Sequence, residues 1–336
     1  MARESGLSIA TISKYLNGGN VLEQNRRLIE DAIAKLDFKV NELARGLKTS
    51  RTMTVGVLIP SFENVFFTSI VSNIENVLLQ EGYSTIVCDY RENPRLEVEK
   101  FQFLLDKMVD GMILMPNSDD DNLIFEVAQA RAAKNIPVVL IDRLIKNVSC
   151  DVVLVDNLNA SYNAVEQLII RGHKRIGIIV GPEEIYTAQE RLKGYIRVHE
   201  DYALPVEPSL IKYGDYQMQS GFELFQELLR VEPRPTAVYV TNYEMTLGAV
   251  IAANEDNLKI PDDLSLIGFD NLALARIVKP SLSIVVQPMQ QIGETASQIL
   301  LRRLKGDQSG FPSISRLKTE LLIRDSIKHL ETQKSK

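Results

Sequence analysis

From residue 54 onward, short apolar runs alternate with longer stretches in which apolar residues recur every three or four positions. The short runs are typical of buried strands and the longer stretches of covering helices, so the pattern predicts parallel sheets built from βαβ units. The predicted strands are residues 54–60, 85–89, 111–116, 138–142, 152–156, 175–181, 237–241, 264–270 and 282–287. The predicted helices include residues 65–81, 97–109, 157–171, 189–200 and 217–229. Because these roughly 280 residues exceed one comfortable core, we expect two doubly wound subdomains with a cleft between them.

Polar residues follow several predicted strands directly. Ligands of open α/β folds bind outside the carboxyl ends of the strands, so these positions are candidate binding residues. They are Asp142, Arg143, Asp156, Asn157, Asn242, Asp270 and Asn271.

The first 50 residues contain no strand-like run and are predicted to form short helices. Ser8 is expected to cap a helix over residues 9–16, a break follows at residues 17–20, and a second helix covers residues 23–36. Ile12 and Leu16 share the packing face of the first of these helices. The pattern fits a helix-turn-helix whose second member enters the major groove, and it fits equally well a helical hairpin that caps the α/β body.

Charge is unevenly distributed along the chain. Lys and Arg number nine against six Asp and Glu in residues 1–51, and 29 against 38 in the rest, so only the front end suits a polyanion. No apolar run approaches the roughly 18 residues of a membrane span, and the N-terminus does not resemble a secretory signal. We therefore expect a cytoplasmic protein that does not contact a membrane.

Common catalytic and metal-binding signatures are absent from the sequence. Cys88 and Cys150 are not part of a paired motif and are expected to be buried thiols, and the three histidines are scattered. The chain also lacks the usual nucleophile elbow and the glycine-rich phosphate loops. We expect no metal, no cofactor and no enzymatic activity.

Eight segments, in order and at the expected spacing, closely resemble the lactose/galactose repressor (LacI/GalR) family of bacterial transcription regulators. The segments are GLSIATISKYLNG at 6–18, NELARGLKT at 41–49, TVGVLIP at 54–60, VLIDR at 139–143, RGHKRIG at 171–177, RLKGY at 191–195, IPDDLSLIGFD at 260–270 and LLIRDS at 321–326. The resemblance covers the whole chain. It implies a small all-α helix-turn-helix domain followed by an α/β body like that of periplasmic sugar-binding proteins, which agrees with the two doubly wound parallel-sheet subdomains expected above.

The resemblance implies DNA contacts from the first helical segment. Lys14 stands where the family usually has Arg, and either cation can donate to guanine, although Lys lacks the rigid fork and should discriminate less. The residues matching base-reading positions are Ile9, Ala10 and Lys14. Those matching phosphate-facing positions, for which helix capping and surface polarity are the alternative roles, are Ser8, Thr11, Ser13 and Asn17.

Residues 41–48 resemble the family's hinge helix. Asn41 begins it, and Leu47 matches the leucine that wedges between base steps, while Ala44 and Lys48 belong to the same DNA-contacting segment. Because helices below roughly 12 residues are marginal in water, this one should fold only against its dimer mate on bent DNA. The alternative is that Leu47 merely packs on the effector domain.

In the cleft, the resemblance assigns effector contacts whose chemistry suits vicinal hydroxyls and the apolar face of a sugar ring. These residues are Phe66, Phe67, Asp142, Arg191, Tyr216, Asn242, Asp270 and Gln287. Nucleobases could use the same set. The alternative for each polar residue is a purely structural role, in which its side chain joins a strand end to the neighbouring helix. Arg143 and Arg175 are alternatives to Arg191 as the binding arginine, because they lie in comparable strand-end or helix-start positions.

The resemblance also implies a domain division. Residues 1–50 form the DNA-binding domain, residues 51–330 the effector-binding and dimerisation domain, and residues 331–336 a polar tail. The larger domain divides into an N-subdomain, residues 53–155 and 287–316, and a C-subdomain, residues 156–286 and 317–330. The tail has no leucine heptads, so we expect a homodimer rather than a tetramer joined by its tails.

Two departures from the family pattern affect the expected function. Met1 falls inside the first helix, so we expect either that the true start lies upstream or that operator is bound weakly. Tyr243 stands where the family usually has an acidic residue, which leaves the ligand less certain.

We expect a repressor whose grip on operator DNA is set by a small carbohydrate-like effector. The alternatives are a small-molecule binding protein with impaired DNA binding and a regulator whose co-repressor is a phosphorylated carrier protein.

Overall fold

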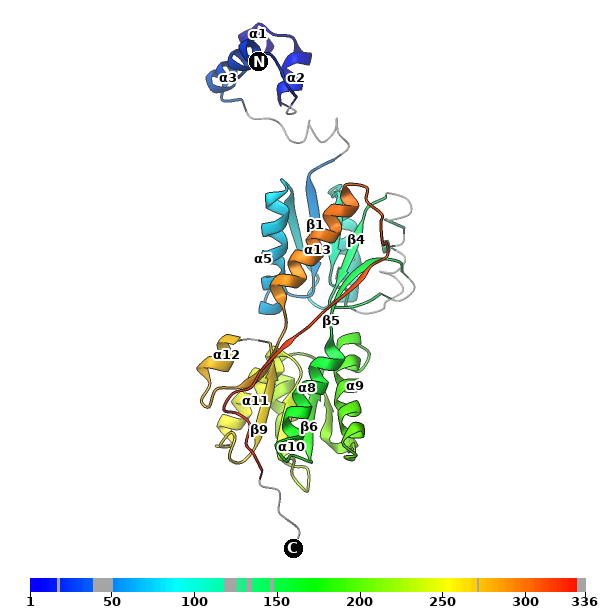
Figure 1. Cartoon of the computed structure of the whole chain (residues 1–336), viewed down its shortest axis with the longest axis vertical. Coiled ribbons are helices and arrows are strands. Elements are labelled where there is room, and N and C mark those ends of the chain that lie inside the picture. Colours follow the sequence, from blue (N-terminus) through cyan, green and yellow to red (C-terminus); the bar gives the residue numbers. More distant parts are fainter. Residues whose placement is uncertain are drawn as a thin grey trace. The chain divides into compact units, whose positions relative to one another are not determined.

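The computed structural model describes two compact units, residues 1–53 and 54–336 (Figure 1). The described residues are 1–16, 19–38, 51–117, 126–127, 129–130, 135–145, 148–270 and 272–330. The expected hinge helix at 41–48, with Asn41, Ala44, Leu47 and Lys48, lies outside them, as does Asn17.

The described residues of the first unit form three short helices. They are α1 (Ala2–Ser5), α2 (Ile9–Leu16) and α3 (Glu23–Leu36). The hydroxyl of Ser8 accepts a hydrogen bond from the Thr11 amide at 3.2 Å, which confirms the predicted cap of α2. Ile12 is buried, as expected, and so are Ile29 and Ala32 of α3.

The second unit contains two six-stranded sheets. The first has the order β11-β5-β4-β3-β1-β2, and every neighbouring pair is parallel. Its strands are β1 (Thr54–Ile59), β2 (Ser84–Asp89), β3 (Gly111–Leu114), β4 (Val138–Ile141), β5 (Asp151–Val155) and β11 (Ile314–Leu317).

The second sheet has the order β12-β10-β9-β8-β6-β7 and is parallel except for the β10–β12 pair. Its strands are β6 (Ile176–Val180), β7 (Ile211–Tyr213), β8 (Ala237–Val240), β9 (Ser265–Phe269), β10 (Ser283–Val286) and β12 (Glu320–Leu322). The structure thus confirms all nine predicted strands and adds β7, β11 and β12.

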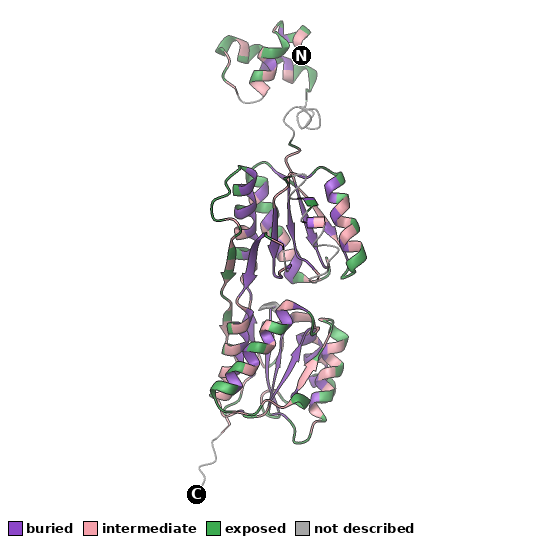
Figure 2. Cartoon of the chain, turned by 90° about the vertical axis from the view of Figure 1, so that its right-hand side faces the viewer, coloured by how far each residue is buried: buried purple, intermediate pink, exposed green. Residues whose placement is uncertain are grey.

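Helices cover the faces of both sheets, whose strands are largely buried between them (Figure 2). Around the first sheet lie α5 (Val65–Gln80), α6 (Pro94–Asp106) and α13 (Met289–Leu304), with α5 and α13 side by side (Figure 1). Around the second lie α8 (Asn157–Ile169), α9 (Tyr186–Asp201), α10 (Met218–Leu229), α11 (Tyr243–Glu255), α12 (Leu272–Ile277) and the short 3-10 helix η1 (Pro208–Leu210).

The predicted helices within the described residues all occur, with shifts at two starts. Helix α6 begins three residues earlier than expected because Asn93 accepts hydrogen bonds from the Arg95 and Leu96 amides and Pro94 fits the first helical position. Helix α9 also begins three residues earlier, at Tyr186.

The chain passes between the two sheets three times. It does so between β5 and α8, between β10 and α13, and between β11 and β12. Figure 1 shows β5 and the β11–β12 segment running from one subdomain into the other. The edges formed by β11 and β12 therefore lie on the connected side, and β2 and β7 form the opposite edges.

Both cysteines are buried, as predicted, and Cys88 belongs to the core of the first sheet together with Cys150. Burial raises the pKa of the Cys88 thiol. Among the described residues no helix is long and apolar enough to span a bilayer. In the same part of the chain, no group of three or more His, Cys, Asp or Glu side chains could hold a metal ion.

Candidate functional site

Two aspartates occupy equivalent positions at the carboxyl ends of the sheets. Asp142 follows β4 with φ of 68°, and Asp270 follows β9 with φ of 67°. Each donates its backbone N–H to the next parallel strand, to Val153 O at 2.9 Å and to Val285 O at 2.7 Å respectively. Left-handed backbone is uncommon for residues other than glycine, although Asp tolerates it better than most, and it turns both carboxylates toward the cleft.

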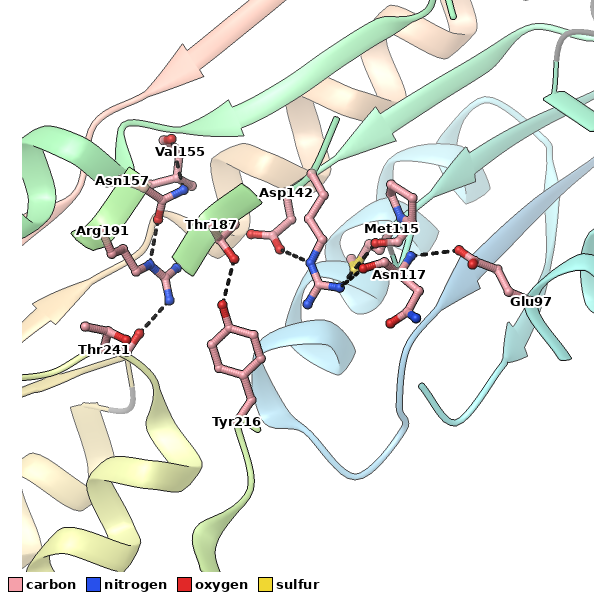
Figure 3. Close-up of polar contacts among 12 residues, drawn as sticks. Glu97, Met115, Asn117, Asp142, Val155, Asn157, Thr187, Arg191, Tyr216 and Thr241 are labelled. Atoms are coloured by element: carbon pink, nitrogen blue, oxygen red, sulfur yellow. Dashed lines mark hydrogen bonds and ion pairs between the residues drawn. The ribbon is translucent and has the colours of Figure 1, made fainter. Parts of the chain in front are cut away.

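Arg191 of α9 is held in the cleft by two hydrogen bonds, which Figure 3 shows, and by an aromatic ring. Its Nε donates to Asn157 Oδ1 at 2.8 Å, and one terminal nitrogen donates to the carbonyl oxygen of Thr241 at 2.5 Å. The guanidinium carbon lies 4.0 Å from the centre of the Phe269 ring, within range of a cation–π interaction. The side chain is buried and fixed in orientation, which suits a binding residue.

Arg143 is a second buried guanidinium, from the other subdomain. One terminal nitrogen donates to the carbonyl oxygen of Asn117 at 2.7 Å, and its Nε lies 3.5 Å from Asp142 Oδ2 (Figure 3). The loop residue Asn117 is in turn held by Glu97, whose carboxylate accepts from the Asn117 amide at 2.8 Å. The sequence offered three arginines as the possible effector-binding guanidinium. Arg143 and Arg191 both line the cleft, whereas Arg175 forms an ion pair with Glu207 and does not line it.

The Asp270 carboxylate accepts a hydrogen bond from Gln287 Nε2 at 2.8 Å. Burial raises the pKa of Asp270 to about 6 against the opposing effects of Arg191 and of this hydrogen bond, and the charge of Asp142 raises it further. The other amide atom, Gln287 Oε1, is buried and has no hydrogen-bond partner in the described protein. An unpaired buried acceptor costs about 1–3 kcal/mol, which a ligand hydroxyl or amine facing it would remove.

Aromatic rings from both subdomains form the apolar walls. Phe66 and Phe67, in the first turn of α5, meet edge to face with ring centres 5.3 Å apart. The Tyr216 hydroxyl and Thr187 Oγ1 are 3.0 Å apart and share a hydrogen bond (Figure 3). The Tyr216 ring lies against Gly181, where an added Cβ would come within 2.0 Å of the ring carbon Cζ, so only glycine leaves room for it.

Asn242 has both ends of its amide engaged by backbone. Its Oδ1 accepts from the Met245 amide at 3.0 Å and caps α11, and its Nδ2 donates to the carbonyl oxygen of Tyr216 at 3.0 Å. The alternative role considered from the sequence, tying a strand end to the next helix, is therefore present in the structure.

These groups surround one cavity between the subdomains. It contains roughly 440 Å³ of empty space when the part open to solvent is included. The eight side chains predicted to contact an effector all line it: Phe66, Phe67, Asp142, Arg191, Tyr216, Asn242, Asp270 and Gln287. Their contact with a ligand stays a prediction. The cavity also includes Arg143, a strand-end candidate from the sequence, and four residues that the sequence did not assign to it, namely Asn64, Glu92, Thr187 and Tyr243.

In the first unit, α2 exposes the residues that the resemblance assigned to base reading. Ile9 is 76% exposed, and Ala10 and Lys14 are also exposed. Ser8 is exposed with its hydroxyl in the cap, and Thr11 and Ser13 are half-buried. Ile9 is therefore accessible at the surface of the first unit, where single exposed apolar residues are common.

A two-lobed α/β body with a polar cleft at its strand ends defines a protein of the periplasmic-binding class. Residues 52–318 match the family model of periplasmic binding proteins and sugar-binding domains of the LacI family. The chain is 34% identical over 330 residues to the catabolite control protein A of Priestia megaterium, with 98% of each chain covered. It is 32% identical over 334 residues to the HTH-type transcriptional repressor PurR of Actinobacillus pleuropneumoniae serotype 3, again covering 98% of each.

Among solved structures, the chain matches a lac repressor dimer bound to operator and the anti-inducer ONPF. The TM-score is 0.87 at 26% identity, and the match covers 97% of both chains. The chain therefore belongs to the LacI family, and these relatives are regulators of transcription rather than enzymes.

Proposed function

We propose that this protein is a transcriptional repressor that binds operator DNA as a homodimer and releases or tightens its hold when a small polyhydroxyl effector occupies the cleft. The observation that carries the proposal is the cavity between the subdomains, with its fixed guanidinium, its two turned-in carboxylates and the unpaired Gln287 Oε1. The lac repressor complex with operator and anti-inducer supports the same combination of ligands here.

In this proposal residues 1–50 form an all-α helix-turn-helix domain with its hinge helix, and α2 lies in the major groove. Lys14, Ile9 and Ala10 read bases, and the eight cavity residues named above contact the effector. We place the protein in the cytoplasm, where a regulator meets the chromosome, and expect it to bind its effector without chemical turnover. An affinity change of about 5- to 150-fold would correspond to roughly 1–3 kcal/mol of coupling.

Operator selection from a random-sequence DNA pool tests DNA binding whatever the operator sequence is. The full chain should enrich a near-palindrome, and Lys14→Ala should weaken binding by about 1–3 kcal/mol and relax the preference at one base pair. Arg27→Ala is the matched control, since it removes a cation from exposed α3, where the side chain lies 3.8 Å from Glu23. Failure to enrich any sequence would contradict the proposed repressor.

Thermal-shift measurements against sugars and nucleobases test the cavity. A ligand at 100 times its dissociation constant adds about 2.7 kcal/mol of stability. Arg191→Met should abolish the shift produced by any compound found. Ligand binding without operator binding would favour the alternative of a small-molecule binding protein.

A second candidate is a regulator whose co-repressor is a phosphorylated carrier protein. It is favoured by an exposed groove near the end of α13, lined in part by Arg302 and Lys305. Lys305 lies 3.0 Å from Glu81, so part of the positive charge is already paired. Loss of carrier-dependent operator binding in Arg302→Ala would support this candidate, and operator binding unaffected by the phosphorylated carrier would exclude it.

A further inference from the structure

The edges formed by β2 and β7 lie on the side of the cleft where no chain segment crosses between the sheets. All three crossings are at or near the opposite edges, formed by β11 and β12. Rotation about the crossings therefore moves the β2 and β7 edges most. A contact made there has the longest lever arm for holding the subdomains closed.

The segment after β2 is a tight turn in an unusual conformation. Arg91 and Glu92 have φ of 52° and 54°, and the Asn93 amide donates to Tyr90 O at 2.9 Å. Two consecutive left-handed residues closed by such a bond resemble a type I′ turn, which strongly prefers Asn and Gly. The Glu92 amide also donates to Pro60 O at 3.1 Å, so the turn is anchored to the end of β1. A long acidic side chain is thus held at a costly position.

The segment after β7 is also held to its own subdomain by hydrogen bonds. The amide of Gly214 donates to Val180 O at 2.8 Å. The Asp215 carboxylate accepts from the Gln217 amide at 2.8 Å and from the Ser220 hydroxyl at 2.5 Å. Tyr216 has φ of 68° and its ring forms part of the cavity wall. The backbone of this loop is therefore fixed to its own subdomain and presents Gln217 outward.

The two segments meet. Gln217 Nε2 donates to Glu92 Oε2 at 3.2 Å, joining residues of different subdomains. Glu92 itself lines the cavity, and Gln217 follows the cavity residue Tyr216 directly. We propose that Glu92 and Gln217 form a latch across the mouth of the effector cleft, which favours the closed state and slows exchange of the effector. Neither residue needs to contact the effector for this role.

The strength of the contact suits a reversible latch. Both partners are solvent-exposed, and an exposed hydrogen bond with a charged acceptor shifts an equilibrium by about threefold to tenfold. Such a contact biases closure without locking it. The inference rests on the proposed function only in taking the cavity as the effector site.

Gln217→Glu tests the latch because it replaces the donor by a carboxylate of the same shape and opposes it to Glu92. Gln219→Glu is the matched control. It makes the same charge change two residues later in the chain, in the first turn of α10. Gln219 Nε2 donates to Glu223 at 2.7 Å, a contact within one subdomain. The double variant Glu92→Gln/Gln217→Glu reverses donor and acceptor and should restore the contact.

Closure is measured on the full-length, ligand-free protein by the distance between spin labels on the exposed positions Arg95→Cys and Arg230→Cys. The native cysteines are buried and leave these two sites for labelling. Gln217→Glu should raise the ratio of open to closed molecules at least threefold, Gln219→Glu should match the parent, and the double variant should return to the parent distribution.

The latch is refuted if Gln217→Glu behaves like the parent, if Gln219→Glu opens the cleft equally, or if the double variant stays open. Neither effector nor operator is present in this experiment. A failed latch therefore leaves the proposed function standing, and absence of operator selection by the parent protein would contradict that function independently.

Discussion

Asp270→Asn should make the stability of the protein less dependent on pH. Burial raises the pKa of this aspartate from 3.8 to about 6, so the native state holds the proton more tightly than the unfolded chain does. The stability contributed by the protonated form is complete below about pH 4 and is lost as pH rises through about 6. The difference of about two pKa units corresponds to about 3 kcal/mol.

The substitution by asparagine removes the charge and leaves the local structure unchanged. Asparagine tolerates the left-handed backbone and keeps the Oδ1 that accepts a hydrogen bond from Gln287. Relative to the parent, Asp270→Asn should gain stability between pH 4 and pH 6 and hold a constant advantage above. The stability gained over this pH range is about 3 kcal/mol, a figure that already includes the attraction between Arg191 and the charged carboxylate. Urea unfolding at pH 4, 5, 6 and 7 measures the difference, with exposed Asp256→Asn as the control. A difference that does not vary with pH would refute the reasoning.

Two further substitutions test the packing that supports the site. Arg303→Ala should lower the free energy of unfolding in urea by about 3–5 kcal/mol. The Nε and one terminal nitrogen of Arg303 each donate to the Asp151 carboxylate at 2.8 Å, so the substitution leaves a buried carboxylate without a counter-ion. Exposed Arg302→Ala should change the free energy little, and equal losses in the two variants would contradict this reasoning. Gly194→Ala would bring a Cβ within 2.2 Å of the Leu158 carbonyl oxygen and force α8 and α9 apart, so thermal unfolding should show a loss of about 1–3 kcal/mol, and an unchanged melting temperature would show that the helices yield freely.

The central strands were predictable because their signal is local. Each predicted run consists of apolar residues that the structure buries on both faces of a parallel sheet, as in β5 and β9. Strand β11 has no such run, since its residues alternate between exposed and half-buried. It is placed by contacts remote in sequence, which are its parallel pairing with β5 and the hydrogen bonds from Ser313 to the distant Asp151. No window of sequence contains that information.

Helix α11 was not singled out for the opposite reason. Buried residues lie around most of its circumference, including Met245, Gly248 and Ala252, so no one-sided apolar stripe marks it. Gly248 packs closely against α10, where an added Cβ would come within 2.0 Å of Met218 O. A helix that is buried on most of its faces has no one-sided apolar pattern, so a search for amphipathic stretches does not detect it.

The part of the site that could be predicted consists of residues that follow strands directly or match family positions. Asp142 and Asp270 follow strands directly, and the structure brings them to one cavity. Glu92 was missed because its turn lacks the Asn or Gly that marks a type I′ conformation. Thr187 was missed because the predicted start of α9 fell after it. The backbone brings Glu92 and Thr187 to the cavity, and the residue types at these two positions do not indicate that backbone conformation.

The way the cavity residues are held explains how occupancy of the cleft can affect the whole molecule. Arg191 is oriented by Asn157, the first residue of α8 after the β5 crossing. Asp270 is held by Gln287, which follows β10 at the start of the second crossing. Both hydrogen bonds join elements of the second sheet's subdomain, so a change in the angle between the subdomains moves Arg191 and Asp270 together relative to the cavity residues of the first sheet, such as Asp142. A ligand that contacts both sets of residues and binds one arrangement more tightly would shift the populations of the two, and no separate pathway between cleft and crossings is required.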